Sequence, residues 1–516
     1  MSAADPIPTI GMEVHLHLAT RTKMFCGCEV RYDAPPNTCV CPVCLGMPGV
    51  LPVMNQVAVE LAVRMALGLG CRIPDFAKWD RKHYYYPDLP KNYQISEYDE
   101  PLGVGGHLDV ELEGETFRVG ITRVHLEEDA GKLVHAEDGS NVSVVDLNRT
   151  GTPLLEIVSE PDIHSAAQAR AYGEALRQLA VYLGVGHCNM QLGQMRFEPN
   201  ISLRIGEDAG GAPRYTPITE IKNLNSFRSV ARAVDFEIRR HRDELAADPD
   251  GYTLENLGKS TRGWNDDRGT SFLQRSKEEA HDYRYFPEPD LVPVRPYELL
   301  ENGASLIDKV KEDMPESQEK KRQHYMSMGL SREQANIFLQ EEDLGECYEK
   351  LLGCLDDLRT PLTWGTDGRD LQVARNWIEQ DVRRALNEER ARSGQDVRLS
   401  DLEHFSEERL AELIILVEQG TTSREVGSRV FDRMLETGNP PDQIIKEENL
   451  AQTSDAGQLE ALVDEVIAEN PDAARQFADG VDKAVGRLIG MAKKKTGGKA
   501  NPKVVRDLLI RKLRGS

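Results

Sequence analysis

Residues Met12–Leu18 limit the fold of this chain more than any other segment. They read Met-Glu-Val-His-Leu-His-Leu, and this strict alternation of apolar and polar residues predicts a half-buried β-strand. One face of the strand holds Val14, Leu16 and Leu18, and the other holds Glu13, His15 and His17. At a rise of about 3.3 Å per residue, the polar side chains follow one another every ~6.5–7 Å. The segment therefore predicts a sheet whose polar face is either a metal or proton-transfer site or a solvated face rich in Glu and His.

The chain of 516 residues is too long for a single core, so two to four domains are expected. Up to about residue 295 the pattern predicts short strands mixed with helices, among them a helix over 56–69 and another beginning at Ser165. After the proline-rich stretch Phe286–Pro296 nearly all segments have helical periodicity. A second boundary near 405–410 divides the helical part into two modules.

The charge of the chain is uneven. A net charge of −23 argues against nonspecific nucleic-acid binding by the chain as a whole. Residues 481–516, however, hold eleven Lys or Arg and two Asp, which suits either local phosphate contacts or a solubilising tail. The chain shows neither a secretory leader nor an apolar run of the roughly 20 residues that a membrane helix needs. We therefore expect a cytoplasmic protein without a membrane partner.

Four of the nine cysteines form two close pairs, Cys26-x-Cys28 and Cys41-x-x-Cys44. Two such turns can present four thiolates to one tetrahedral zinc ion, which leaves no open position and makes the zinc structural. Cys39 could replace one ligand or stay free. A redox pair is the alternative, but a proline inside the second pair favours a zinc knuckle.

Acidic residues recur in apolar surroundings. Residues 127–129 are Glu-Glu-Asp, and Glu156, Glu198 and Glu220 each lie in a strand-like segment. Neighbouring carboxylates raise one another's pKa, and a hard divalent cation relieves this repulsion. The Glu-Glu-Asp run alone would also suit an exposed acidic turn. Residues 80–88 combine basic and aromatic side chains, which suits phosphates and flat rings or simply a packed loop.

Several catalytic motifs are missing. Leu257–Ser260 reads Leu-Gly-Lys-Ser, but position 253 is Thr where a Walker A loop needs Gly. The sequence has no Gly-x-Ser-x-Gly elbow and no serine-lysine amidase signature. If the reaction uses ammonia, another protein must supply it.

Long segments of the chain resemble one family, the B subunits of the tRNA-dependent amidotransferase GatCAB, and the resemblance runs essentially from end to end. The matching segments are 10–15, 41–48, 80–91, 125–133, 148–158, 220–227 and 282–290. The resemblance implies an α+β fold with three domains. A catalytic antiparallel-sheet cradle similar to glutamine synthetase, with a zinc-knuckle insertion, takes residues 1–295. A helical domain and a tRNA-binding tail domain follow at 296–409 and 410–516, which agrees with the boundaries near 296 and 410.

The resemblance also implies the reaction. Such a subunit uses ATP and Mg²⁺ to phosphorylate the side-chain carboxylate of misacylated Glu-tRNA(Gln), Asp-tRNA(Asn) or both, and ammonia then displaces the phosphate. A glutaminase A subunit delivers the ammonia through a tunnel, and a small C subunit clamps the other two. The misacylated tRNA contacts the helical and tail domains, and the non-discriminating synthetase is a further expected partner.

Site residues follow from the same resemblance. The expected Mg²⁺ ligands are Glu13, His15, Glu128, Glu198 and Glu220. Expected contacts to the nucleotide are Glu127, Glu156, Asn223 and Asn225, and candidates for holding phosphate, chosen by charge, are Arg149, Lys222 and Arg284. Near the tunnel mouth we expect Lys82, Tyr85 and Lys91, and around zinc Cys26, Cys28, Cys41 and Cys44.

The chain departs from the family pattern at several positions, among them Gln191-Leu192, where many members have an acidic pair. Many members have Cys-Asp where this chain has Phe197-Glu198, and Glu reaches one methylene further toward a metal. Cys39 replaces the usual Asn. A zinc nucleobase deaminase is excluded because its His-x-Glu and Pro-Cys-x-x-Cys motifs would both have to be reversed here. The remaining alternative is a non-catalytic tRNA-binding scaffold, which would have no need of Glu13, His15, Glu128 and Glu220 together.

Overall fold

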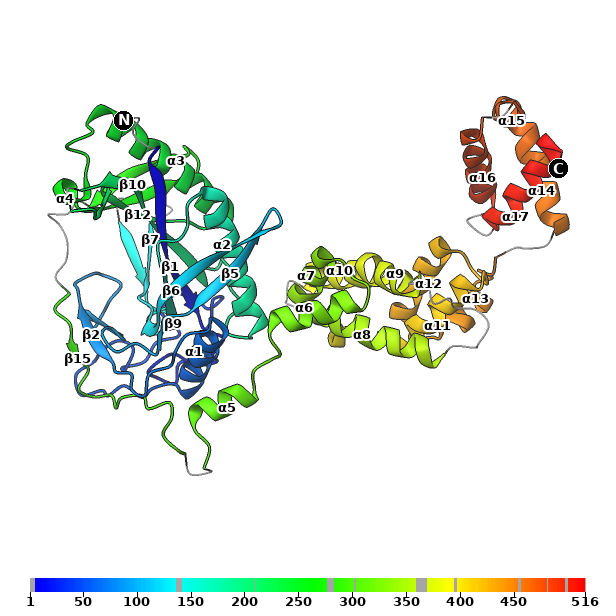
Figure 1. The fold of residues 1–516 in the computed structure, drawn as a ribbon. Helices are drawn as coiled ribbons and strands as arrows, with labels where there is room; N and C mark the ends of the chain where they lie inside the picture. Colours follow the sequence, from blue (N-terminus) through cyan, green and yellow to red (C-terminus); the bar gives the residue numbers. More distant parts are fainter. Residues whose placement is uncertain are drawn as a thin grey trace. The chain divides into compact units, whose positions relative to one another are not determined.

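The computed structural model describes residues 5–135, 142–208, 210–275, 283–300, 303–358, 369–393, 397–452, 456–479, 481–496 and 500–515. The chain divides into two compact units, Met1–Gln318 and Glu319–Ser516 (Figure 1). In the described ranges no helix is both long enough and apolar enough to cross a membrane. Strands dominate the first unit and helices form the second, as expected of an α+β protein.

The first unit is built on one large sheet. Its strand order is β14-β13-β12-β10-β1-β9-β6-β3-β2-β15, and β4, β5 and β11 pair at its margins. The described pairs are antiparallel except β12 with β13. Its strands are β1 (Ile7–His17), β2 (Asp80–His83), β3 (Tyr93–Ser96), β4 (Gly103–Val104), β5 (His107–Leu112), β6 (Glu115–Glu128), β9 (Pro153–Ser159), β10 (Met195–Glu207), β11 (Pro213–Tyr215), β12 (Ile218–Lys222), β13 (Lys259–Asn265), β14 (Thr270–Arg275) and β15 (Phe286–Pro287). A separate hairpin pairs β7 (Lys132–His135) with β8 (Ser143–Asp146).

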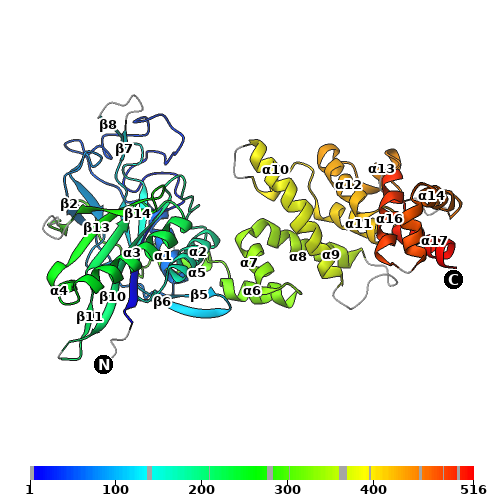
Figure 2. The same cartoon turned by 90° about the horizontal axis from the view of Figure 1, so that it is seen from above.

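The alternation in β1 produces the two predicted faces. Met12, Val14 and Leu16 are at most 1% exposed and belong to the main core. Three helices cover this face with apolar side chains: α1 (Gln56–Gly68), α2 (Ala166–Tyr182) and α3 (Phe227–Ala247) (Figures 1 and 2). The opposite face carries the polar side chains, because successive residues of a strand point to opposite sides.

The first unit continues beyond the expected boundary at residue 295. After the short helix α4 (Leu254–Leu257), the last helix of the unit is α5 (Leu306–Glu312). Helix α5 packs against α1, and Lys309 Nζ donates a hydrogen bond to Glu60 Oε1 at 2.6 Å. Ile307 and Val310 of α5 join the main core, so this segment belongs to the sheet unit.

The second unit is built of helices joined by turns and loops. Its helices are α6 (Gln318–Ser327), α7 (Arg332–Gln340), α8 (Glu342–Asp357), α9 (Arg369–Trp377), the π-helix η2 (Ile378–Val382), α10 (Arg383–Ser393), the 3₁₀ helix η3 (Leu399–Asp401), α11 (Glu407–Glu418), α12 (Arg424–Thr437), α13 (Pro441–Glu447), α14 (Ala456–Glu469), α15 (Pro471–Ala478), α16 (Lys483–Lys495) and α17 (Pro502–Arg514). Ser331 and Gln334 form a capping box at the start of α7. Helix α11 packs on α8, whereas α14–α17 enclose an apolar core of their own.

Candidate active site

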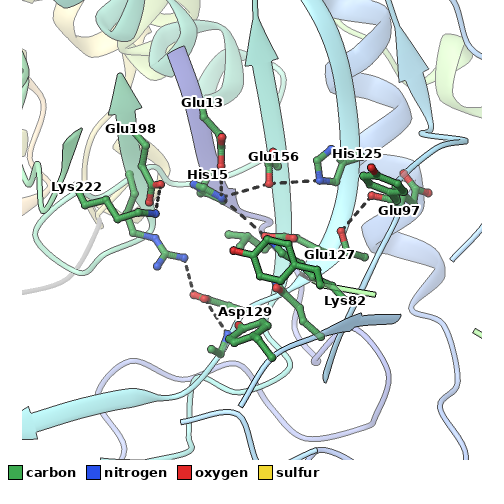
Figure 3. Close-up of a pocket in the computed structure, with 18 of the residues that line it drawn as sticks. Glu13, His15, Lys82, Glu97, His125, Glu127, Asp129, Glu156, Glu198 and Lys222 are labelled. Atoms are coloured by element: carbon green, nitrogen blue, oxygen red, sulfur yellow. Dashed lines mark hydrogen bonds and ion pairs between the residues drawn. The ribbon is translucent and has the colours of Figure 1, made fainter. Parts of the chain in front are cut away.

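The polar face of β1 forms part of the wall of a cavity of about 520 Å³ (Figure 3). Side chains from β2, β3, β6, β9, β10, β12 and β13 and from neighbouring loops also line this pocket, hereafter the main pocket. Strand β1 lies between β9 and β10, and this register sets Glu13 opposite Glu198 and His15 opposite Glu156. Residues far apart in sequence therefore meet on one face of the sheet.

His15 is the centre of an acidic cluster. Its Nε2 atom lies 3.4 Å from Glu156 Oε2, 3.6 Å from Glu13 Oε1 and 3.9 Å from Glu127 Oε1. Two groups could each hold a metal ion, because their ligand atoms all lie within 4.8 Å of one another. These groups are Glu13, His15 and Glu198, and His15, Glu127 and Glu156.

Burial and neighbouring charges shift the pKa values of Glu13 and His15 in this cluster. Burial and the charge of Glu156 raise the pKa of Glu13 to about 7. Burial alone would lower the pKa of His15, but its hydrogen bond to Glu156 and the charge of Glu198 raise that pKa to about 9. His15 Nδ1 and Glu127 Oε2 are buried without a hydrogen-bond partner among the described residues. Clustered carboxylates with unused ligand atoms fit a divalent cation.

Two acids of the main pocket, Glu198 and Glu220, are bonded to lysine side chains. Lys222 Nζ donates a hydrogen bond to Glu198 Oε2 at 2.5 Å. Glu220 accepts hydrogen bonds from Lys259 Nζ at 3.3 Å and from Thr261 Oγ1 at 2.7 Å. The pocket therefore combines acids that could hold a cation with ammonium groups that are bonded to Glu198 and Glu220.

Another side of the main pocket is organised by Asp129, which is 4% exposed. Its Oδ2 atom lies 2.7 Å from His17 Nε2, 2.9 Å from Arg196 Nη2 and 3.3 Å from Arg149 Nε. Burial would raise the pKa of Asp129, but Arg196, Arg149 and His17 hold it well below its usual range. This carboxylate is a fixed negative charge between two guanidinium groups.

The main pocket collects most of the predicted site residues. Those that line it are Glu13, His15, Lys82, Glu127, Arg149, Glu156, Glu198, Glu220 and Lys222. Glu128 does not join them, because it follows Glu127 on β6 and the two side chains point to opposite faces. Glu128 Oε1 accepts hydrogen bonds from Lys91 Nζ and from the Ile95 backbone N–H. Both Glu128 and Lys91 line a second cavity of about 140 Å³, beside Cys26 and Cys44.

Four other expected site residues lie outside the lining of the main pocket. Tyr85 is 73% exposed. Arg284 and Asn223 occupy positive-φ positions, at 42° and 67°, and the Arg284 carbonyl contacts His83 Nδ1 at 3.2 Å. Asn225 lines a different cavity, which Arg149 also borders.

The main pocket also contains groups that the residue pattern did not single out. His125 Nε2 lies 3.4 Å from Glu156 Oε2, and Arg196 is bonded to Asp129. Both positions could have been found from strand parity, since His125 is two residues from Glu127 and Arg196 is two residues from Glu198. Glu97 gave no such signal, although burial raises its pKa to about 7. Within the part of the chain that the structure describes, its Oε1 atom is buried without a partner.

The four predicted zinc ligands come together. The Sγ atoms of Cys26, Cys28, Cys41 and Cys44 all lie within 4.8 Å of one another. The Cys41 and Cys44 sulfurs are 3.9 Å apart, close to the ~3.8 Å edge of a tetrahedron with Zn–S bonds of about 2.3 Å. Cys39 is not in this group, and its carbonyl accepts a hydrogen bond from the buried Lys23 Nζ at 2.7 Å.

Comparison with known proteins extends over both units. A family model described as the GatB/GatE catalytic domain matches residues 8–300, and one described as the GatB domain matches residues 365–513. A Moorella thermoacetica protein, named as the B subunit of aspartyl/glutamyl-tRNA(Asn/Gln) amidotransferase, is 44% identical over 506 residues, covering 98% of this chain and 99% of its own. Proteins of the same name from Geotalea daltonii and a Picosynechococcus species are 42% identical over 513 residues and 41% identical over 533 residues. They cover 98% and 100% of this chain, and 99% and 100% of their own.

Proposed function

Because the chain belongs to the family of aspartyl/glutamyl-tRNA(Asn/Gln) amidotransferase B subunits, we propose that its main pocket activates the misacylated side chain with ATP. The chain is a component of a tRNA-dependent amidotransferase, a ligase of several subunits that amidates misacylated Glu-tRNA(Gln) or Asp-tRNA(Asn). In this proposal a glutaminase A subunit and a small C subunit are its partners.

The observation that carries the proposal is that carboxylates and cationic side chains line one pocket together. Phosphorylating a carboxylate with ATP joins two anions, so charge neutralisation is the main task of the protein. Glu13, His15 and Glu198 would hold Mg²⁺, which when bound neutralises phosphate oxygens. Lys222 and Arg149 line the same pocket, and in this proposal they contact phosphate.

Ammonia needs a route that does not cross the nucleotide. Lys82 lines the main pocket, with its Nζ atom 5.0 Å from the centroid of the Tyr283 ring. Burial disfavours its charged form, but the charge of Glu127 holds the pKa of Lys82 above its usual range. A permanent cation there can stabilise the oxyanion that forms when ammonia attacks the activated carboxyl group. We assign the cavity with Lys91 and Glu128 to the ammonia side, with Tyr85 near its entrance.

Trapping the activated carboxyl group tests this function. The reconstituted three-subunit enzyme, given misacylated tRNA, ATP and hydroxylamine but no glutamine, should form an aminoacyl-side-chain hydroxamate and ADP in equal amounts. Running the assay with Glu-tRNA(Gln) and with Asp-tRNA(Asn) identifies the substrate. A non-catalytic scaffold would bind the tRNA but yield neither product, and that result would refute the proposal.

The C-terminal four-helix module, α14–α17, is proposed to hold tRNA. Its last turns are basic, with Lys493–Lys495 on α16 and Arg511, Lys512 and Arg514 on α17. The module has its own core, so a chain ending at residue 452 removes it without opening the contact between α11 and α8.

We expect this truncation to raise the KM for aminoacyl-tRNA about tenfold or more, because several phosphate contacts are lost. The rise should shrink as the salt concentration increases, and the glutaminase rate of the partner should be unaffected. Steady-state kinetics at two ionic strengths measures both effects. An unchanged KM would mean that the module does not grip tRNA.

A further inference from the structure

Asp129 combines a buried carboxylate with two arginines on the wall of the main pocket. Its Oδ1 atom accepts a hydrogen bond from the Ala130 backbone N–H at 2.9 Å, which fixes the orientation of the carboxylate. Its Oδ2 atom contacts the side chains of His17, Arg196 and Arg149, at 2.7, 2.9 and 3.3 Å. Figure 3 shows Asp129 on the side of the pocket away from Glu13, joined by dashed lines to its neighbours.

The two arginines differ in how much of their bonding capacity the protein uses. Arg149 donates to the Ala130 carbonyl at 3.0 Å and also to the Gly131 carbonyl, so it helps to hold the loop after β6. Arg196 bonds Asp129 through Nη2, while its Nε–H is buried and has no partner among the residues that the structure describes. A guanidinium carries five N–H groups in a fixed planar fork that matches phosphate and carboxylate oxygens. Arg196 therefore has a buried N–H that no described residue uses, and its side chain, which is 31% exposed, lines the pocket.

The strand register places Arg196 beside the acidic cluster. It lies opposite His15 in the β1–β10 ladder and two residues from Glu198, so the three side chains share one face. Asp129 balances one of the two guanidinium charges, and Glu198 also acts on Arg196, so a cation bound at Glu198 would free more of the arginine charge for an anion. An anion with several oxygens could thus contact Arg196 on one side and a cation held by Glu13 and Glu198 on the other.

We propose that Arg196 binds the phosphoryl group during its transfer from ATP, and that Asp129 and His17 are positioning residues for this guanidinium. This inference rests on the proposed function. In the transfer the bond from the γ-phosphorus to the bridging oxygen breaks, ADP keeps the electron pair, and a carboxylate oxygen of the substrate forms the new bond. In the next step nitrogen forms a bond to the carbonyl carbon, the carbon–oxygen bond breaks, and phosphate leaves with the electron pair. Phosphate accepts the proton released by ammonia.

The experiment compares three variants of the assembled enzyme with wild type. Arg196→Met should lower kcat for tRNA-dependent ADP formation about a hundredfold or more, since it removes a charge aimed at the developing phosphate. Arg196→Lys should recover part of the loss, because it keeps the charge without the fork. Asp129→Asn should give an intermediate loss of kcat and leave the KM for aminoacyl-tRNA unchanged.

A binding measurement separates this role from a structural one. Inorganic phosphate with ADP should inhibit wild type at a concentration at least about tenfold lower than it inhibits Arg196→Met. The matched control is Arg204→Met, which removes an exposed arginine of the same strand whose Nη2 bonds Glu207. It should behave as wild type, and Arg196→Lys, which keeps a charge beside Asp129, should keep the wild-type melting temperature.

The outcomes are distinct. If wild type forms no hydroxamate, the proposed function itself fails. If wild type forms it and Arg196→Met forms it at the same rate, only the role of Arg196 fails. If Arg196→Met changes the KM for aminoacyl-tRNA while kcat and phosphate inhibition stay constant, this guanidinium binds the aminoacyl carboxylate, and the phosphoryl assignment is overturned.

Discussion

Replacing Glu13 with Gln should lower kcat for tRNA-dependent ADP formation by at least about a hundredfold, while misacylated tRNA still binds. Glu13 lies opposite Glu198 across two adjacent strands and next to His15, and the ligand atoms of these three residues lie within 4.8 Å of one another. The amide has nearly the shape of the carboxylate but no charge, so it removes cation binding and preserves the packing. The Mg²⁺ concentration needed for half-maximal activity should rise as well.

The matching control is Glu207→Gln on β10, which removes an exposed carboxylate on one of the same strands. We expect it to match wild type in kcat and in its response to Mg²⁺. Glu198→Gln should reproduce the loss seen with Glu13→Gln, and the double variant should lose little more, because both residues act on one ion. Full activity in Glu13→Gln would refute the cation site.

The double variant Cys26→Ser/Cys41→Ser should reduce the zinc content of the purified protein from about one ion per chain to near zero. It removes one thiolate from each close pair, and the two remaining sulfurs cannot complete a tetrahedral site. The knuckle also borders the cavity that holds Lys91 and Glu128, so we expect a lower melting temperature for the first unit. Elemental analysis and thermal unfolding measure the two effects.

Cys39→Ser is the control for this experiment, because Cys39 lies nearby but outside the group of four sulfurs. It should keep its zinc and its melting temperature. Stoichiometric zinc in the double variant would place the ion elsewhere, and loss of zinc from Cys39→Ser would make Cys39 a ligand.

The sequence predicted those features that depend on period and spacing. Alternation of apolar residues identified β1, because a strand with one buried face must repeat every two residues. The four cysteines could be grouped because short spacings already hold each pair of sulfurs together. The position of Glu198 beside Glu13 depends instead on the pairing of β1 with β10, which joins distant segments. Only the resemblance to a known family predicted that Glu198 and Glu13 lie close together.

The alternation of side chains along a strand explains where the expected site residues and the structure differ. Glu127 and Glu128 were both expected near the metal and nucleotide, although adjacent residues of a strand cannot face the same side. Arg196 was passed over even though it shares the parity of Glu198. Glu97 could not be found in this way, because its role as a pocket residue comes from burial at the end of β3 and not from a repeating pattern.

Strand β6 lies between the two cavities, so its register alone decides which of its side chains border each one. The pairing of β6 with β9 is irregular between Ile121 and Arg123, and the residues that follow keep the phase set there. With that phase, Glu127 borders the main pocket and Glu128 borders the cavity next to the cysteines. A slip of one residue would turn Glu127 away from the main pocket and Glu128 toward it, so it would change the side chains that border both cavities at once. A substitution at Glu127 or Glu128 thus changes one cavity only. An insertion or deletion in β6 before these residues would change both cavities together.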